Sequence, residues 1–93
     1  MLRTTKVKNR NAYQLTFVLP ADAPAGPVSV VGDFNGWTPG RHKFGSLRDG
    51  SRTVSVRVPA GQPLRFRYLA AGGQWFDDPD VPDRDGNDCV IRL

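Results

Sequence analysis

Two tryptophans are the residues of this sequence best suited to chemistry at a surface. Trp37 directly follows the turn residues Asn35-Gly36, and Trp75 closely follows Gly72-Gly73. An indole ring offers a flat apolar face with negative π density, which can fill a core or stack on the apolar C–H face of a sugar ring. Each tryptophan stands beside a turn rather than at the centre of a strand. Spacing alone therefore leaves both the core and the surface interpretation open.

Arg67 and Asn87 are candidate polar partners for such aromatic platforms. A ligand that stacks on an aromatic ring still needs donors and acceptors around its rim, and a guanidinium and an amide can supply them without a deep pocket. From spacing alone, Arg67 also fits a solvated strand face and Asn87 also fits a turn. These two positions are thus candidates that need a further argument.

Catalytic groups are scarce in the chain. His42 is the one histidine, which excludes a histidine metal cluster and leaves a serine–histidine–aspartate triad without an apolar frame. Six of the nine acidic residues crowd into residues 77–88, a segment that we expect to be solvated. A glycosidase needs two carboxylates across a cleft, one of them with a raised pKa, and no apolar pocket for this is evident. The sequence predicts no enzyme, no cofactor and no metal site.

The segment DRDGND, residues 83–88, invites a calcium interpretation. The helix–loop–helix calcium loop requires glycine at its sixth position, whereas the glycine here is the fourth residue. We therefore expect a turn closed by aspartate side chains, and a calcium site of another geometry stays open.

Length and composition set the class of protein. With 93 residues, the chain is expected to form one domain. No apolar run reaches the roughly 18 residues of a membrane-spanning helix. The basic residues 1–10 are not followed by the apolar core of a signal peptide. Cys89 is the single cysteine, so it has no internal disulfide partner, and we interpret it as a small buried hydrophobe in a cytoplasmic protein.

Alternating apolar residues predict a fold made of strands. The chain has 10 glycines, 8 prolines and no glutamate, a composition that disfavours long helices. Apolar side chains recur at every second residue in three segments, which places one face of each strand inside: residues 13–19 (Tyr13, Leu15, Phe17, Leu19), residues 53–58 (Val54, Val56, Val58) and residues 64–69 (Leu64, Phe66, Tyr68).

The remaining strands and turns follow from shorter signals. Residues 28–31 and 89–93 are predicted as strands, and residues 41–47 as a strand of weak pattern. Hairpin turns are expected at residues 48–51 and at Gly72-Gly73, and a long polar loop over residues 77–88. Trp75 and Phe76 must point to opposite faces of their strand. About seven strands at this spacing predict an immunoglobulin-like antiparallel β-sandwich over residues 11–93, preceded by a basic arm or ragged first strand over residues 1–10.

One stretch resembles a known family. Residues 31–37, VGDFNGW, resemble the signature of the family-48 carbohydrate-binding modules, also called isoamylase N-terminal or early-set domains. The family includes the N-terminal domains of glycogen branching and debranching enzymes and the glycogen-binding domain of the AMP-activated kinase beta subunit. The similarity continues through residues 66–69 (FRYL), 73–75 (GQW), Asp78-Pro79 and the strand that ends the chain, and it covers roughly residues 13–93.

The resemblance implies a function and a site. It implies a non-catalytic, free-standing module that binds α-1,4-glucans such as glycogen, starch and malto-oligosaccharides. Trp37 and Trp75 match the family's sugar-stacking tryptophans. Arg67 matches a basic residue on the strand before the second tryptophan, where the kinase module has lysine. Asn87 matches an asparagine that enters the last strand, with an alignment uncertainty of one residue against Asp88. A glycogen-metabolism protein is left open as a partner.

Two other functions remain as alternatives. An early-set domain that has lost sugar binding would act in protein interaction or regulation, through an exposed edge strand or through the basic arm. Burial of either tryptophan would favour that alternative. Single-stranded nucleic acid is suggested by a net charge of +4 and by aromatic residues interleaved with Arg65 and Arg67. The scattered positive charge and the acidic segment near Trp75 argue against nucleic acid.

Overall fold

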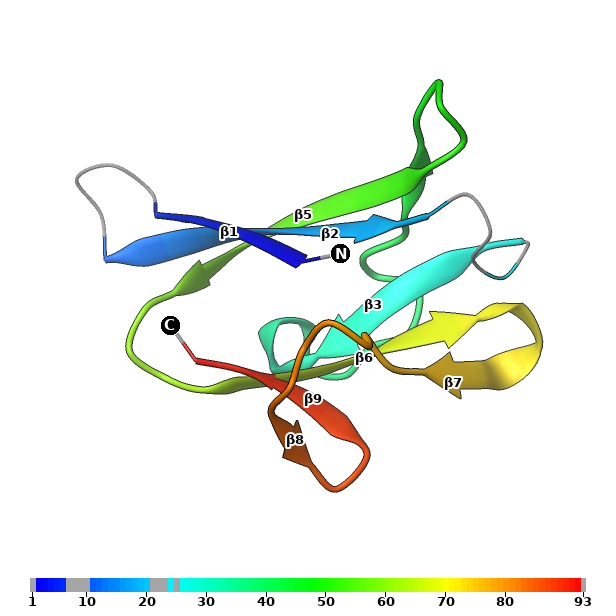
Figure 1. The fold of residues 1–93 in the computed structure, drawn as a ribbon. Coiled ribbons are helices and arrows are strands. Elements are labelled where there is room, and N and C mark those ends of the chain that lie inside the picture. The colour runs from blue at the N-terminus through cyan, green and yellow to red at the C-terminus, as the bar shows by residue number, and fades with distance from the viewer. Residues whose placement is uncertain (1, 7–10, 21–23, 25, 93) are drawn as a thin grey trace.

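The chain folds into two antiparallel β-sheets that face each other (Figure 1). The computed structural model describes residues 2–6, 11–20, 24 and 26–92. One sheet has the strand order β1 (Leu2–Lys6), β2 (Ala12–Leu19), β5 (Arg52–Pro59) and β4 (Gly45–Ser46). The other contains β3 (Val28–Gly32), β6 (Leu64–Ala70), β9 (Asp88–Ile91), β8 (Arg84–Asp85) and β7 (Gln74–Phe76). These sheets confirm the prediction of an all-β fold with two antiparallel layers.

Strand β6 is the centre of the five-stranded sheet. One of its edges pairs with β3, from Gly32 opposite Phe66 to Val28 opposite Ala70. Its other edge is shared, because β9 pairs with the first half of β6 and β7 pairs with the second half. Three segments that are distant in sequence therefore lie side by side around β6, which positions the candidate site residues.

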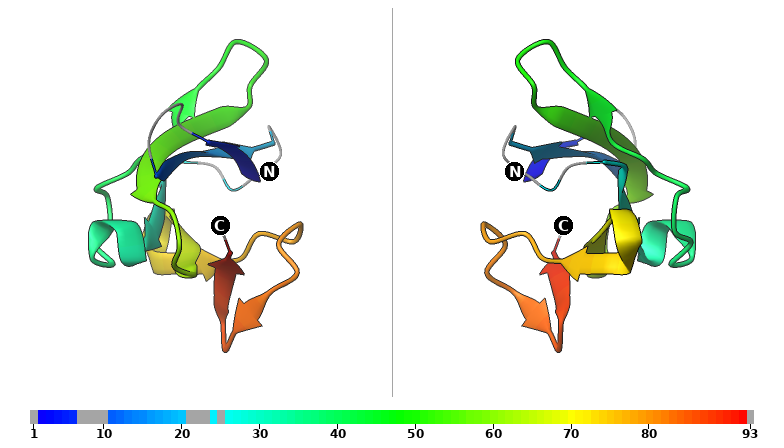
Figure 2. Two further views of the ribbon diagram at one scale, coloured as in Figure 1. Left: turned by 90° about the vertical axis from the view of Figure 1, so that its left-hand side faces the viewer. Right: turned by 90° about the vertical axis from the view of Figure 1, so that its right-hand side faces the viewer.

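The described residues contain no α-helix, only two single turns of 3₁₀-helix, η1 (Asp33–Asn35) and η2 (Ala71–Gly73). The first follows β3 and lies beside the end of the five-stranded sheet (Figure 2). The second forms the connection between β6 and β7 at the predicted Gly72-Gly73 turn. Each turn ends two residues before a candidate tryptophan, η1 before Trp37 and η2 before Trp75. The two turns therefore set where each indole leaves the chain.

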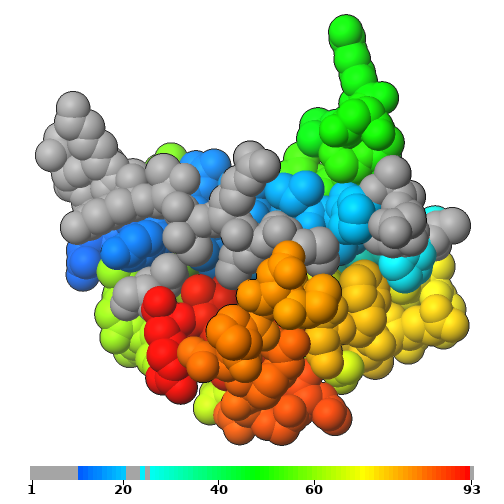
Figure 3. Space-filling view, viewed as in Figure 1, coloured from blue at the N-terminus to red at the C-terminus, as the bar shows by residue number. Residues whose placement is uncertain are grey.

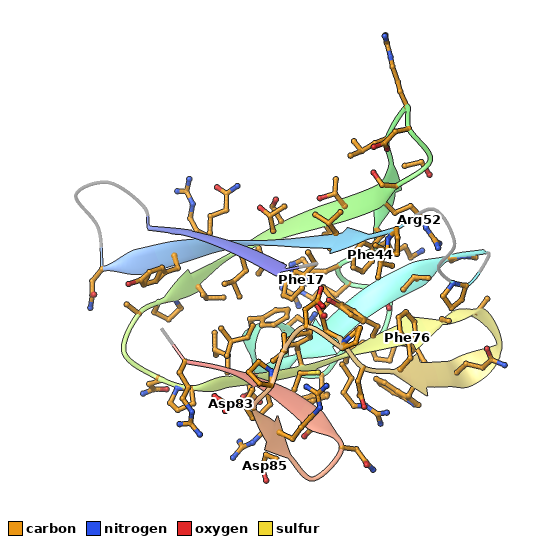
Figure 4. All side chains as sticks on the ribbon, in the orientation of Figure 1. Phe17, Phe44, Arg52, Phe76, Asp83 and Asp85 are labelled. Carbon is orange, nitrogen blue, oxygen red and sulfur yellow. The ribbon has the colours of Figure 1, made fainter. Side chains whose placement is uncertain are left out.

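The core lies between the sheets and is built by the predicted alternation. Leu15, Phe17 and Leu19 of β2 have no exposed surface, and neither do Phe66 and Tyr68 of β6. The ring of Phe17 packs edge-on against that of Phe66, with centroids 5.1 Å apart. Removing each such aromatic ring from water contributes about 1.5–3 kcal/mol to folding. Figure 4 shows Phe17, Phe44 and Phe76 in this interlayer space. The inward faces predicted for these strands are confirmed.

The segment after η1 departs from the single strand predicted over residues 41–47. Residues 42–44 follow β3 of one sheet: Val30 N donates to His42 O, and Phe44 N donates to Val28 O. Only Gly45–Ser46 pairs with β5 of the other sheet. The segment thus passes from the edge of one sheet to the edge of the other. The prediction of one strand over residues 41–47 was therefore wrong in extent, because residues 42–44 pair with one sheet and residues 45–46 with the other.

The beginning and end of the chain also refine the predictions. Leu2–Lys6 pairs with β2 as strand β1, while residues 7–10 of the predicted arm lie outside the described residues. The long loop predicted over residues 77–88 is wrong at its end, because Arg84–Asp85 forms β8 and pairs with β9 in a short hairpin. The described residues therefore form nine strands, two of which have two residues each, instead of about seven. Leu93 lies outside the described residues.

A hairpin tip projects from the body of the molecule (Figure 3). It joins β4 to β5 through the predicted Asp49-Gly50 turn, where the Asp49 carboxylate accepts hydrogen bonds from Ser51 N at 3.0 Å and Ser51 Oγ at 2.6 Å. These two bonds lower the pKa of Asp49, and the bond from the Ser51 hydroxyl has the larger effect. Leu47 at the base of the tip is 50% exposed.

Candidate functional site

The strand register places two of the four candidate residues on one face of the five-stranded sheet. Alternation along β6 turns Phe66, Tyr68 and Ala70 toward the core, so Arg65, Arg67 and Leu69 lie on the opposite side. We call this side the outer face. Leu69 is paired with Trp75 across β7, which brings Trp75 to the outer face as well. Val31, opposite Arg67, belongs to this face but has no exposed surface.

Trp75 is an exposed aromatic surface with a cation beside it. Trp75 is 43% exposed. The neighbouring Phe76 points to the other side of β7 and packs on the core ring of Tyr68, with ring centroids 5.2 Å apart. The predicted opposition of Trp75 and Phe76 is confirmed. The Arg67 guanidinium carbon lies 5.5 Å from the centroid of the Trp75 ring. This is cation–π distance, and the contact fixes the two side chains relative to each other.

Arg67 is held from a second direction by Asp77. Its Nε donates to Asp77 Oδ1 at 3.1 Å, and the two side chains are 22% and 38% exposed. The guanidinium is therefore positioned by an ion pair on one side and an aromatic ring on the other. Its NH₂ groups have no hydrogen bond to any described residue, so they can donate to a ligand placed on Trp75. Sequence reasoning missed Asp77, although its spacing of two from Trp75 signals the same face of an extended strand.

The turn that carries Trp37 is closed by the side chain of Asn35. This amide is 5% exposed; its Oδ1 accepts from Gly32 N at 3.1 Å, and its Nδ2 donates to Val30 O at 3.0 Å. The same Nδ2 lies 2.9 Å from His42 Nδ1, which must accept the bond as an unprotonated ring nitrogen. His42 is thus part of the support for the turn. The asparagine of the signature stretch is a buried structural residue.

Gly32 begins this turn because no side chain fits there. A Cβ at Gly32 would collide with the Arg65 carbonyl oxygen and would lie 2.9 Å from both the Phe34 ring and Phe66 Cβ. Phe34 is partly buried against the core, with its ring 5.9 Å from that of Phe17. The glycine and the phenylalanine of the stretch therefore fasten the turn to β6 and to the core.

Trp37 leaves the turn in a strained conformation and is held there by Asp33. Its φ is +57°, and Trp37 is the one non-glycine residue with positive φ among the described residues. A bulky residue in this region costs about 1–3 kcal/mol and persists only where its surroundings require it. Trp37 N donates to Gly32 O at 3.0 Å, and the indole Nε1 donates to Asp33 Oδ1 at 2.9 Å.

Asp33 connects Trp37 to the strand that carries Arg67. While Oδ1 accepts the indole N–H, Oδ2 accepts from the backbone N of Arg65 at 2.9 Å. Trp37 is half-buried, and its ring nitrogen is already paired, so only its ring face and edge remain for a ligand. Neither tryptophan is buried, so the burial that would have favoured a protein-interaction domain is not observed. The role of Asp33 was missed, although its place inside the signature stretch signalled it.

Asn87 lies at the tip of the β8–β9 hairpin. It is exposed, and its side chain makes no hydrogen bond to a described residue. Val90 is opposite Arg65, so alternation along β9 puts Asp88, rather than Asn87, on the outer face. The ion pair with Asp85 raises the pKa of Arg65, and the nearby charge of Asp88 adds a smaller effect in the same direction. The structure thus brings Arg67 and Trp75 together, links Trp37 to their sheet, and leaves Asn87 at its margin.

The acidic segment is largely used for internal support. Asp78 is fully buried; its carboxylate accepts from Tyr68 OH at 2.7 Å and from Asp80 N at 2.9 Å. Burial, followed by this hydrogen bond, raises the pKa of Tyr68. Arg84 donates to the carbonyl oxygens of Val81 and Asp78, which ties β8 to the segment. No group of three or more potential metal ligands is found in the part of the chain that the structure describes.

Cys89 is buried in the core, as predicted. It has no exposed surface, and burial raises the pKa of its thiol. Its Sγ accepts from Asp78 N at 3.4 Å and lies 3.2 Å from Arg84 NH1. A protonated, inaccessible thiol is a packing residue and not a nucleophile.

Comparison with known proteins adds no assignment, since no protein-family model and no curated protein matches the chain. Among the described residues, no helix has the length and apolar character needed to cross a membrane.

Proposed function

We propose that this protein is a non-catalytic α-glucan-binding module with the immunoglobulin-like architecture of the family-48 carbohydrate-binding modules. The observation that carries the proposal is the pairing on the outer face of an exposed indole, Trp75, with a guanidinium 5.5 Å from its ring centroid. Trp37, fixed to the same sheet through Asp33, supplies a second aromatic group. The resemblance of residues 31–37 to the family signature supports the choice of ligand.

The chemistry of the outer face suits a sugar chain. The C–H face of a glucose ring stacks on an indole, and its hydroxyl rim takes hydrogen bonds from Arg67. Arg67 and Trp75 are already held by each other and by Asp77, so binding costs little additional ordering of these side chains. Asn87 is a further polar partner only for a ligand that extends to the β8–β9 hairpin.

The affinity is expected to be modest. Two stacked rings and a few hydrogen bonds, less the entropy of ordering a flexible glucan, correspond to a Kd of roughly 10 μM to 1 mM, or about −4 to −7 kcal/mol. Because the charge of Arg67 is balanced by Asp77, the positive potential beside Trp75 is weak, and an anionic ligand gains little there over a neutral one. This balance favours sugar over nucleic acid.

Tryptophan fluorescence tests the proposal directly, since both indoles belong to the site. Titration with maltoheptaose should give a saturable change in emission, and cellohexaose, a β-linked glucan of similar length, should give none. Isothermal titration calorimetry with the same ligands checks that the change reports binding. The absence of saturable binding to maltoheptaose, or equal binding to both glucans, would overturn the proposal.

A further inference from the structure

A surface pocket lies on the outer face next to the Trp75 platform. Ser29 of β3, Leu69 of β6 and Trp75 of β7 are paired across three adjacent strands and share this face. On the β3 side of Leu69, residues including Pro27, Ser29, Lys43 and Leu69 line a pocket of about 170 Å³. This volume is about five to six times the ~30 Å³ that one water takes in the liquid. The pocket is therefore large enough for a small ring and too small for a large ligand.

The wall of the pocket formed by Lys43 is fixed to the sheet. Lys43 forms an antiparallel bridge with Ser29, and the hydrogen bonds of His42 and Phe44 to β3 flank that bridge. The Lys43 side chain also runs along Gly40, where a Cβ would lie 3.5 Å from Lys43 Cε. The backbone of Lys43 is thus held beside the pocket by its pairing with β3, and its side chain passes close to Gly40.

The polar groups of this pocket are donors. Ser29 is 94% buried, at 6% exposure, and its Oγ accepts from Gly40 N at 3.3 Å, which leaves the hydroxyl proton without an acceptor among the described residues. The Lys43 ammonium has three donors, and none of the ion pairs among the described residues includes it. No carboxylate is found among the lining residues. The floor contributed by Pro27, Leu69 and Ala71 is apolar.

We propose that this pocket binds one sugar unit of the glucan, beyond the unit that stacks on Trp75. The inference rests on the proposed function and narrows its substrate class to linear α-glucans long enough to reach both places. An apolar floor with donors at the rim complements the C–H face and the oxygen atoms of a pyranose ring. Ser29 and Trp75 are separated by two strand spacings, about 10 Å, which a short malto-oligosaccharide spans.

Dependence of affinity on chain length tests the pocket separately from the platform. We expect wild-type protein to bind maltoheptaose more tightly than maltose by calorimetry. Lys43→Ala should weaken maltoheptaose binding about three- to tenfold and leave maltose binding unchanged, because the two rings of maltose are too close together to occupy both Trp75 and the pocket. Ser29→Ala, which removes only the hydroxyl, should act in the same direction. Arg57→Ala removes an exposed cation from the other sheet and is the matched control.

Backbone amide shifts in NMR spectra locate the two ligands independently of affinity. Maltoheptaose should shift the amides of Ser29, Gly40 and Trp75, whereas maltose should shift Trp75 alone. Equal weakening of both ligands by Lys43→Ala, or no weakening, would overturn the pocket while the Trp75 platform stands. Displacement of maltoheptaose by millimolar inorganic phosphate would assign Lys43 to an anion and likewise overturn it. Failure of wild-type protein to bind either oligosaccharide would overturn the proposed function and this inference together.

Discussion

Trp75 and Trp37 are attached to the same sheet, but the chain supports them differently. Trp75 is placed by strand register alone: it lies opposite Leu69, and its side-chain partner is Arg67. Trp37 is placed by a turn whose buried amide, Asn35, closes three contacts and whose carboxylate, Asp33, holds the indole.

This difference separates binding from folding. An exposed strand residue can be removed at little cost to the fold, because its backbone bonds remain. A residue in the turn shares a buried network, so changes there alter stability together with the position of Trp37. The following variants exploit that separation.

The largest effect is expected for Asn35→Ala. Truncation leaves Gly32 N without its acceptor and removes the donor to Val30 O, both in a buried setting. Each lost partner costs about 1–3 kcal/mol, so for the two together we expect a loss of about 2–6 kcal/mol in the free energy of unfolding. Urea denaturation measures it, with the exposed Asn11→Ala as control. A loss below about 0.5 kcal/mol would show that the turn does not depend on this amide.

Trp75→Ala should affect binding without affecting stability. Loss of the stacking face is expected to weaken maltoheptaose binding at least about tenfold, which corresponds to about 1.4 kcal/mol. The free energy of unfolding should stay within about 0.5 kcal/mol of wild type, since the residue is exposed and Phe76 retains the core contact. Calorimetry and urea denaturation give the two numbers. Unchanged affinity in the folded variant would remove Trp75 from the site.

Trp37 offers a comparison of two truncations. Both Trp37→Ala and Trp37→Gly remove the aromatic face, and both should weaken maltoheptaose binding. At a φ of +57°, however, alanine retains the steric cost of a left-handed conformation, about 1–2 kcal/mol, and glycine does not. We therefore expect the glycine variant to be the more stable by about 1 kcal/mol in urea denaturation. The opposite order would mean that this turn relaxes once the indole is removed.

The sequence was sufficient to predict the two sheets and the inward face of each main strand. Apolar residues alternate strictly in residues 13–19 and 64–69, and in a strand this pattern buries one face. It was insufficient where pairing is decided between segments. Residues 42–44 pair with β3 and residues 45–46 pair with β5 of the other sheet. Residues 84–85 pair with β9. Their own residues carry little pattern for either choice.

The candidate site divides in the same way. The sequence indicated which residue types could stack and donate, and alternation from Trp75 would have indicated Asp77. The links of Asp33 to Arg65, and of Asn35 to His42, join residues through a turn whose shape no residue pattern specifies. For Asn87 and Asp88, one residue of register decides which side chain reaches the outer face, and the pairing of Val90 with Arg65 supplies it.

The smallest effect is expected for Arg67→Lys. Lysine keeps the cation near Trp75 and Asp77 but loses the planar guanidinium that contacts both. We expect maltoheptaose binding to weaken by no more than about threefold, roughly 0.6 kcal/mol, whereas Arg67→Gln, which removes the charge, should weaken it further. Arg57→Lys, on the other sheet, is the matched control.

Salt dependence then decides what the cation at position 67 does. Because Asp77 neutralises Arg67 at 3.1 Å, raising NaCl from about 50 to 500 mM should change the Kd for maltoheptaose less than about twofold in wild-type protein and in Arg67→Lys alike. A polyanionic ligand such as single-stranded nucleic acid would instead lose orders of magnitude in affinity over that range. A steep salt dependence of maltoheptaose binding would show that the outer face recognises charge, and it would reduce the two tryptophans to supports for an arginine site.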